Sequence, residues 1–409
     1  MACIVPRFFF INKITSCPNL FKVSKDIFKL GLENITPQLL KSLSTTGYLD
    51  YTVGLITNST GVDQKGRRTV DILRSHGLRV KKIYMIEEDF CAYKKNSNGI
   101  LRDDQTNIPI TLLSESALSL KNFASCFTDI EVLFFDIQDT GMSSSAYLLI
   151  LNNALKSSVN TKRAFVVLDR PNLLGGIMEG ISTALPTTPL VSIPLRHGMT
   201  IGELALYCNS LLSAPSAQLH VVSMQHYTRT LFAEGITGFP TLLTNIDTYY
   251  GSSFLTSLEY VLPLDVGRGT QHEFTCLTLP DSLRFTKQKW FELRAILKEY
   301  SIETAWCHYI HPKKRKAYSG LRLQVRNIES LAPFNVIVRL IQFFKEAGVY
   351  LQICPEFYQI CGGKKMQNFL EGKFSSHDLM CEVNKGLKAF FNTAYRSFMY
   401  KPVPKIMLL

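Results

Sequence analysis

The 409-residue chain is long enough for two domains, because a single hydrophobic core rarely grows beyond about 250–300 residues. The composition is 46% apolar and 19% charged, as in globular proteins, and no 20-residue apolar run predicts a transmembrane helix. The net charge of +12 favours an anionic partner. Nucleic acid is disfavoured as that partner, because the sequence carries no helix-turn-helix, zinc-finger or RNA-binding motif.

Cysteine usage and the N-terminus bear on the compartment. The ten cysteines form no C-x-x-C pair, so the sequence predicts neither a metal site nor a disulfide framework, and a reducing compartment fits better. The apolar stretch at 8–11 is short for a signal core. We therefore expect a cytoplasmic protein, with export to the cell envelope as the alternative.

From residue 50 to 225 the chain alternates β-rich runs with helical patterns. Strands are predicted at 52–57, 79–86, 131–136, 164–169 and 218–222. Helices are predicted around 66–76, 115–125 and 145–157, and another begins at Thr200, whose spacing to Glu203 is that of a capping box. This alternation predicts an α/β fold with a mostly parallel, Rossmann-like sheet.

The pattern changes after residue 250. Helices are predicted at 286–299, 334–346 and 377–398, and shorter strands at 274–279, 320–325 and 350–353. We expect a Rossmann-like domain at 1–250, a smaller α+β domain at 251–409, and a cleft between them.

Polar clusters follow four of the predicted parallel strands. They are Asn58 to Thr60, Glu87 to Asp89, Asp136 to Asp139 and Asp169 to Asn172. Ligands of open parallel sheets bind beyond the carboxyl ends of the strands, so the four clusters predict a site for a hydroxyl-rich ligand. Loop solvation alone is the competing explanation for any one of them.

Nucleotide and serine hydrolase chemistry lack their motifs, since no G-x-G-x-x-G follows the first strand and neither a P-loop nor a G-x-S-x-G elbow occurs. No cofactor is predicted. Carboxylates remain as catalytic groups, and glycoside hydrolysis needs a protonated acid together with a second group. We assign Glu87 as the acid and Asp136, Asp139 or Asp169 as the second carboxylate.

Five motifs in order resemble the bacterial exo-β-N-acetylmuramidases, the NamZ or YbbC-like family. They are "VGLITNSTGVD" (53–63), "FFDIQDTG" (134–141), "VLDRPNLLGG" (167–176), "IPLRHGMTIGELA" (193–205) and "VGRGT" (266–270). The resemblance implies a Rossmann-like domain, a smaller second domain, and release of N-acetylmuramic acid from the non-reducing end of peptidoglycan fragments without a metal or nucleotide. The catalytic glutamate of the family falls on Glu87.

Two motifs depart from the family pattern. The proline, histidine and glycine around the glutamate are replaced by Ile86, Glu88 and Asp89, and the coupled acid Glu88 would change the titration of Glu87. After "DIQDTG" the family carries an arginine and tyrosines, where this chain has "MSSSAY" (142–147). A protein that binds muramic acid or a peptidoglycan fragment without cleaving it is therefore the alternative function.

Several further residues are predicted to bind the sugar. Arg196 and His197 precede a helix N-terminus, which attracts anions, so Arg196 is a candidate receptor for the lactyl carboxylate of muramic acid. The remaining candidates are Asn58, Gln138, Arg170, Asn172 and Arg268. Structural roles compete at each position: Asp169 as a bridge to an arginine, Arg170 and Asn172 as turn residues, and Arg268 as a pin for its own loop.

Overall fold

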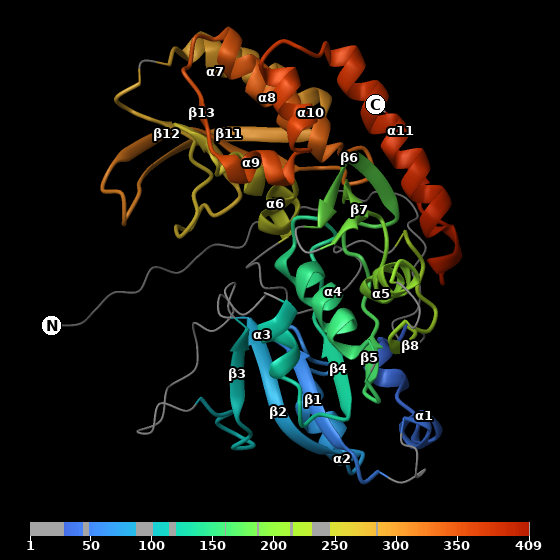
Figure 1. Ribbon diagram of the computed structural model, residues 1–409. Coiled ribbons are helices and arrows are strands. Elements are labelled where there is room, and N and C mark those ends of the chain that lie inside the picture. The colour runs from blue at the N-terminus through green and yellow to red at the C-terminus, as the bar shows by residue number, and fades with distance from the viewer. Residues whose placement is uncertain are drawn as a thin grey trace, which may run out of the picture.

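The computed structural model describes residues 28–43, 49–86, 101–113, 120–159, 161–185, 188–212, 216–230, 246–283 and 285–408. A six-stranded sheet in the order β3-β2-β1-β4-β5-β8 forms the centre of the first half (Figure 1), and all five of its strand pairs are parallel. Its strands are β1 (Thr52–Thr57), β2 (Arg79–Ile86), β3 (Ile110–Leu113), β4 (Val132–Asp136), β5 (Ala164–Leu168) and β8 (Gln218–Val222).

Helices cover both faces of this sheet. The helical elements of this half are η1 (Gly31–Asn34), α1 (Pro37–Ser42), α2 (Thr69–Ser75), α3 (Leu120–Ser125), α4 (Ala146–Ser158) and α5 (Ile201–Ser210). Alternate strand residues face opposite sides. Leu55 and Phe134 therefore enter the core beneath α1 and α2, whereas Ile56 and Phe135 enter the core shared with α4 and α5. The predicted α/β, Rossmann-like class is confirmed.

The second half begins at residue 246 and is built on smaller sheets, one of which also contains two strands of the first half. Strands β10 (Cys276–Pro280), β12 (Ala317–Val325) and β11 (Ile302–Ile310) form an antiparallel sheet in that order. Strands β6 (Ile177–Leu185) and β7 (Thr188–Arg196) pair with each other, β14 (Lys405–Ile406) joins β6, and β9 (Val261–Leu262) pairs with β13 (Gln352–Ile353). The helical elements are α6 (Ile246–Leu258), α7 (Lys287–Glu299), α8 (Pro333–Glu346), α9 (Pro355–Ile360), α10 (Lys364–Leu370), α11 (Ser376–Ala394) and η5 (Tyr395–Ser397).

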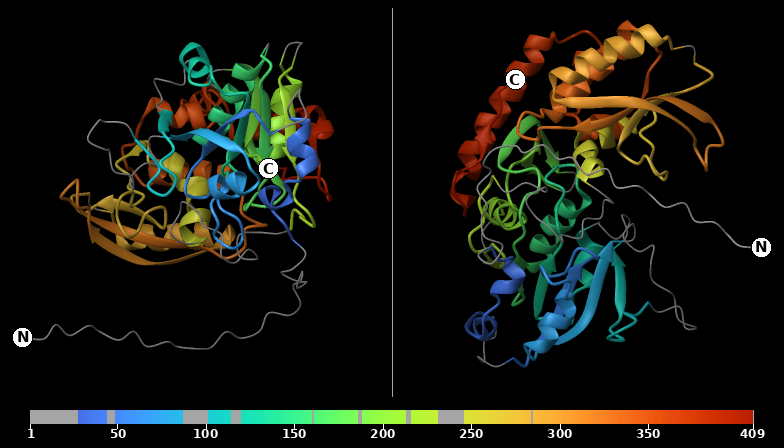
Figure 2. Two further views of the ribbon diagram at one scale, coloured as in Figure 1. Left: turned by 90° about the horizontal axis from the view of Figure 1, so that it is seen from below. Right: turned by 180° about the vertical axis from the view of Figure 1, so that it is seen from behind.

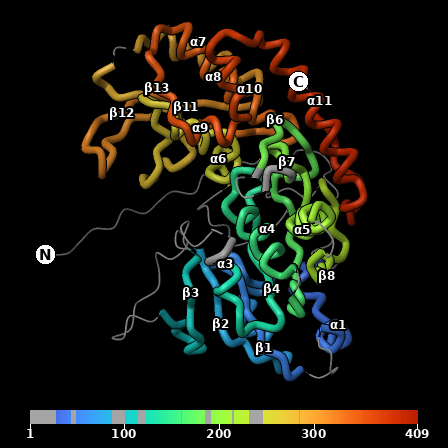
Figure 3. The backbone as a smooth tube through the Cα atoms, viewed as in Figure 1, coloured from blue at the N-terminus to red at the C-terminus, as the bar shows by residue number. Residues whose placement is uncertain are grey.

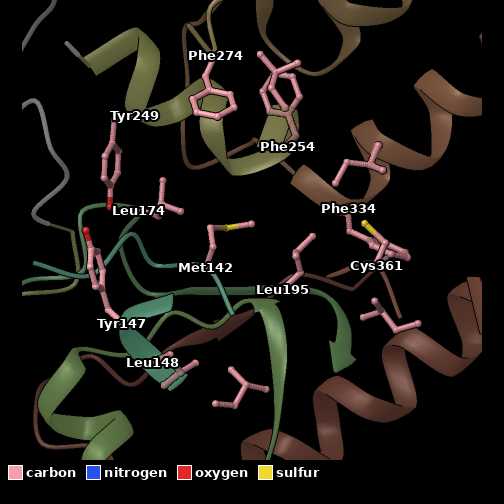
Figure 4. Packing of buried hydrophobic residues seen from close by; sticks show 14 of the residues in the cluster. Met142, Tyr147, Leu148, Leu174, Leu195, Tyr249, Phe254, Phe274, Phe334 and Cys361 are labelled. Carbon is pink, nitrogen blue, oxygen red and sulfur yellow. The ribbon is translucent and has the colours of Figure 1, made fainter. Parts of the chain in front are cut away.

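The two halves share one hydrophobic core. Tyr249 and Phe254 of α6 pack in the same cluster as Met142, Leu174 and Leu195 of the first half (Figure 4). Helix α11 runs along the side of the molecule against β6 and β7 (Figure 2), and the chain then continues through η5 beside α5 (Figure 3). The predicted domain boundary at residue 250 falls within α6 and stays a prediction.

The sequence predicted five of the six parallel strands closely and missed β3 and the β6–β7 hairpin. The predicted ranges 52–57, 79–86 and 218–222 coincide with β1, β2 and β8. Gly180 lies within β6 at a positive φ of 85°. In the described ranges no helix is long and apolar enough to cross a membrane.

Glu179 of β6 caps a helix of the second half. Helix α8 has Ala332 at its N-cap and no capping side chain there, but the carboxylate of Glu179 accepts hydrogen bonds from the amides of Phe334 (3.2 Å) and Asn335 (3.3 Å). These amides lack partners within the helix. Burial raises the pKa of Glu179 to about 7, against the lowering effect of the Phe334 amide and the Arg196 charge.

Glu179 makes stability dependent on pH, and Glu179→Gln is expected to remove that dependence. Its pKa rises from 4.5 to about 7 on folding, so its stabilising contribution is complete below pH 4.5 and is lost as the pH rises through 7. The free energy of unfolding of the wild type, minus that of the variant, should fall by on the order of 3 kcal/mol from pH 4.5 to 8.5. Urea denaturation at several pH values measures it, and a difference that stays constant with pH would contradict this account.

Candidate functional site

The polar clusters after β1, β4 and β5 meet at the carboxyl edge of the sheet. The backbone amide of Gln138 donates to the hydroxyl of Thr60 (2.9 Å), which joins the first two clusters. The side-chain amide of Gln138 donates to the carbonyl of Pro171 (2.7 Å), which joins the third. The cluster after β2, with Glu87, lies outside the described residues. The convergence predicted from strand order therefore holds for the three clusters within the described ranges.

Asp136 forms a buried ion pair with Arg170. Arg170 donates from Nε to Asp136 Oδ1 (2.5 Å) and from Nη2 to Oδ2 (2.8 Å), and both side chains are at most 1% exposed. Thr69 adds a hydroxyl hydrogen bond to the same carboxylate. These contacts give the pair a structural part at the edge of the sheet, and the predicted catalytic role of Asp136 and sugar-binding role of Arg170 stay predictions.

The carboxylate of Asp169 accepts hydrogen bonds at the N-terminus of α5. Its Oδ1 accepts from the amides of Arg170 (2.9 Å) and Gly202 (2.8 Å), and its Oδ2 accepts from the hydroxyls of Thr200 (2.9 Å) and Tyr400 (2.6 Å). Burial raises the pKa of Asp169 to about 7, and the hydrogen bonds oppose this rise. With four donors inside the protein, Asp169 holds the start of α5, and its predicted catalytic role stays a prediction.

The α5 N-terminus is consequently not open to a substrate anion. Thr200 and Glu203 form the predicted capping box, which is confirmed. Glu203 also pairs with the buried Arg229 and accepts from the amide of Met399 (2.7 Å), which fixes the end of the chain beside this helix. The carboxylates of Asp169 and Glu203 therefore occupy the place predicted for a ligand anion.

Arg196 ties the two halves together. It ends β7, is fully buried, and donates to the carbonyls of Ile328 (3.0 Å), Leu331 (2.9 Å) and Leu174. Burial lowers the pKa of its guanidinium to about 10, and the charge of Glu179 opposes this. Its guanidinium thus contacts backbone carbonyls of both halves, and the prediction that Arg196 receives a substrate carboxylate stays a prediction.

Asp139 keeps one carboxylate oxygen without a partner. Its Oδ2 accepts from Gly141 N (2.7 Å) and lies 3.1 Å from His197 Nε2, whereas its buried Oδ1 has no hydrogen-bond partner in the described part of the chain. His197 Nδ1 accepts from the amide of Met199 (3.2 Å), so the proton of a neutral ring resides on Nε2 and is donated to Asp139. His197 thereby orients Asp139, and both of its nitrogens are engaged.

Two further oxygens of the loop between β4 and α4 share this property. Gln138 Oε1 and Ser143 Oγ are buried and have no hydrogen-bond partner among the described residues. An unpaired buried acceptor costs about 1–3 kcal/mol, so native proteins keep few of them. Three such atoms lie within six residues at the edge of the sheet, and we take this cluster as the candidate site.

Asn58 and Asn172 form hydrogen bonds that stabilise the loops after β1 and β5. Asn58 Oδ1 accepts from the amide (2.9 Å) and hydroxyl (2.5 Å) of Thr60, and its Nδ2 donates to the hydroxyl of Tyr147 (3.1 Å). Asn172 donates to the carbonyl of Met199 (2.9 Å) and accepts from the amide of Leu174 (2.9 Å). These contacts use the side-chain amides internally, and the predicted sugar-binding roles of the two asparagines stay predictions.

Arg268 lies apart from these loops. It pairs with Glu259 at 2.7 Å beside the end of α6, and its side chain is 52% exposed. The predicted role of Arg268 in sugar binding stays a prediction.

Sequence reasoning missed Ser143 and Tyr249 as parts of this region. The hydroxyl of Tyr249, on α6, donates to the carbonyl of Thr140 (2.8 Å), so the second half positions the loop that carries Asp139. Figure 4 shows the hydroxyls of Tyr249 and Tyr147 directed toward each other at this loop. No motif links residue 249 to residue 140, and only the tertiary structure reveals the contact.

Comparisons with known proteins bear on the family and the fold of the chain. Residues 53–240 match the family described as exo-beta-N-acetylmuramidase NamZ, N-terminal. This match covers less than half of the chain, and over these residues the chain is similar to the NamZ family. It is also similar to the peptidoglycan beta-N-acetylmuramidase NamZ of Bacillus subtilis, with 30% identity over 264 residues that span 61% of each chain.

Solved structures show how far the fold extends beyond the NamZ match. Two crystal structures of DUF1343 family proteins from Bacteroides fragilis resemble this chain with TM-scores of 0.71 and 0.65, at 23% and 20% identity. Each comparison covers 91% of this chain and 99% of the other. Both halves of the molecule therefore belong to one shared fold.

Proposed function

We propose that this protein is a glycoside hydrolase that releases N-acetylmuramic acid from the non-reducing end of peptidoglycan fragments. The observation that carries the proposal is the unpartnered oxygen of Asp139 beside Gln138 Oε1 and Ser143 Oγ, within the part of the chain that matches NamZ. Three acceptors of this kind suit a ligand rich in hydroxyl and amide groups. The net charge of +12 suits its carboxylate.

The reaction needs an acid at the leaving oxygen and a carboxylate near the anomeric carbon. Glu87 directly follows Ile86, the last residue of β2, and is our acid. Among the three aspartates considered for the second role, Asp136 and Asp169 are saturated with protein donors, so we assign it to Asp139. In this assignment Asp139 stabilises the positive charge that develops on the sugar, His197 orients Asp139, and Gln138 accepts a hydrogen bond from the substrate.

An experiment with one substrate distinguishes cleavage from binding without cleavage. The purified protein is incubated with the disaccharide N-acetylmuramyl-β-1,4-N-acetylglucosamine, and the released monosaccharides are quantified by mass spectrometry. The proposal expects both sugars in equal amounts. Calorimetric binding of the disaccharide without any release would instead support a non-catalytic muramic-acid-binding protein, the function favoured by the replaced "MSSSAY" motif.

A further inference from the structure

A small cavity opens beside the carboxyl ends of β1 and β2, on the face of the sheet that α2 covers. Its volume is about 60 Å³. Five apolar side chains line it: Val62, Val70 of α2, Ile83 and Met85 of β2, and Ile110 of β3. Thr57, Asn58 and Ser59 add polar groups where β1 ends. Met85, which lines the cavity, lies two residues before Glu87, the proposed acid, in the sequence.

The size of the cavity limits what it accepts. Pockets that hold a whole ligand measure about 300–1,000 Å³, whereas a water molecule takes up about 30 Å³ of liquid. A cavity of about 60 Å³ therefore admits one substituent of a few non-hydrogen atoms and excludes a sugar ring.

The charges around the cavity exclude an anionic substituent. Arg68, the cation in its lining, donates to Asp71 (2.8 Å) and to Asp103 (2.7 Å), and Asp103 itself lines the cavity. One guanidinium thus faces two carboxylates. A third carboxylate, such as that of a lactyl group, would be repelled, while an uncharged group ending in a methyl would meet Val70, Ile83, Met85 and Ile110.

We infer that this cavity is the subsite for the acetamido group of the bound N-acetylated sugar, and that Val70 and Ile83 set the length of the accepted acyl chain. The inference rests on the proposed function. The acetamido group is the uncharged, methyl-terminated substituent of N-acetylmuramic acid. Its methyl lies against the apolar walls, and its polar atoms lie toward Ser59, an exposed residue of the lining.

Chromogenic β-glycosides of muramic acid that carry N-acetyl, N-propanoyl or N-butanoyl groups test this subsite. Each added methylene is expected to lower kcat/KM of the wild type about tenfold. Val70→Ala and Ile83→Val enlarge the cavity from two different elements, so each should raise the N-butanoyl to N-acetyl ratio of kcat/KM at least fivefold. Val80→Ala is the matched control, because Val80 lies in the same core on β2 but does not line the cavity.

Binding separates failure of the subsite from failure of the proposed function. Calorimetry with free N-acetylmuramic acid and its N-butanoyl analogue measures acyl discrimination without turnover. If the wild type discriminates in binding but cleaves none of the glycosides, the proposed hydrolase is contradicted and the subsite stands. If it cleaves all three with equal kcat/KM, or if the control alters the ratio as much as Val70→Ala, the subsite is contradicted and the hydrolase stands.

Discussion

Replacing Asp139 by asparagine is expected to lower kcat for release of N-acetylmuramic acid about 100- to 1,000-fold, with a much smaller change in KM. A preorganised charge that stabilises a transition state contributes effects of this size. Asparagine keeps the shape of the side chain and the acceptor for Gly141 N, but it removes the negative charge. Initial rates with a chromogenic N-acetylmuramide give both constants.

A second aspartate–histidine pair provides the control for Asp139→Asn. Asp281 Oδ2 lies 3.2 Å from His308 Nε2, close to the 3.1 Å of the Asp139–His197 pair, but both of its side chains are exposed. Asp281→Asn should leave kcat within about twofold, because an exposed charge pair contributes little. Equal, small effects of the two substitutions would contradict the role assigned to Asp139.

His197 is a positioning residue in this account, and two substitutions separate that role from a merely structural one. The amide nitrogen of glutamine takes the place of the ring Nε2, so His197→Gln should retain the donor to Asp139 and most of kcat. His197→Ala removes the donor and should lower kcat at least tenfold. Equal kcat in the two variants, with both folded by circular dichroism, would show that the donor is irrelevant.

Replacing Arg170 by methionine is expected to lower the free energy of unfolding by about 3–5 kcal/mol. Breaking a buried ion pair leaves one uncompensated charge, here the carboxylate of Asp136, which is 0% exposed. Removing both charges in Asp136→Asn/Arg170→Met should recover part of the loss, since no buried ion then remains. Urea denaturation of the single and double variants measures the coupling.

The exposed pair of Arg326 and Glu303 is the reference for the Arg170 variant. Its atoms are 2.6 Å apart, but the two side chains are 52% and 63% exposed. Arg326→Met should therefore change the free energy of unfolding by less than about 1 kcal/mol. A change for Arg170→Met no larger than that for Arg326→Met would contradict the structural role of the buried pair.

The sequence predicted the parallel sheet because each central strand is a short apolar run bounded by polar residues. Strand β4 is such a run: the sequence predicts it at 131–136, and the structure has it at Val132–Asp136. It did not predict the β6–β7 hairpin, because Pro194 and Gly180 interrupt the strand pattern and the pairing depends on contacts with α8 and α11.

The sequence predicted where the polar clusters meet better than it predicted the contacts of each residue. Strand order alone brought Gln138, Asp139 and Asp169 to one edge of the sheet. It did not indicate that Asp169 accepts a hydrogen bond from Tyr400, which lies 231 residues later. Nor did it indicate that Arg196 donates to backbone carbonyls more than 130 residues later. Such partners depend on how the second half folds back, and periodicity carries no information about them.

The central claim is that Glu87 protonates the leaving oxygen of a muramyl glycoside, and leaving-group dependence tests it most directly. A 2,4-dinitrophenolate departs without a proton, whereas a sugar leaving group needs one. With Glu87→Gln, kcat should fall about 1,000-fold for the N-acetylmuramyl-N-acetylglucosamine disaccharide but less than about tenfold for the first step of the dinitrophenyl N-acetylmuramide. Equal losses on both substrates, or no release of N-acetylmuramic acid by the wild type, would contradict the account.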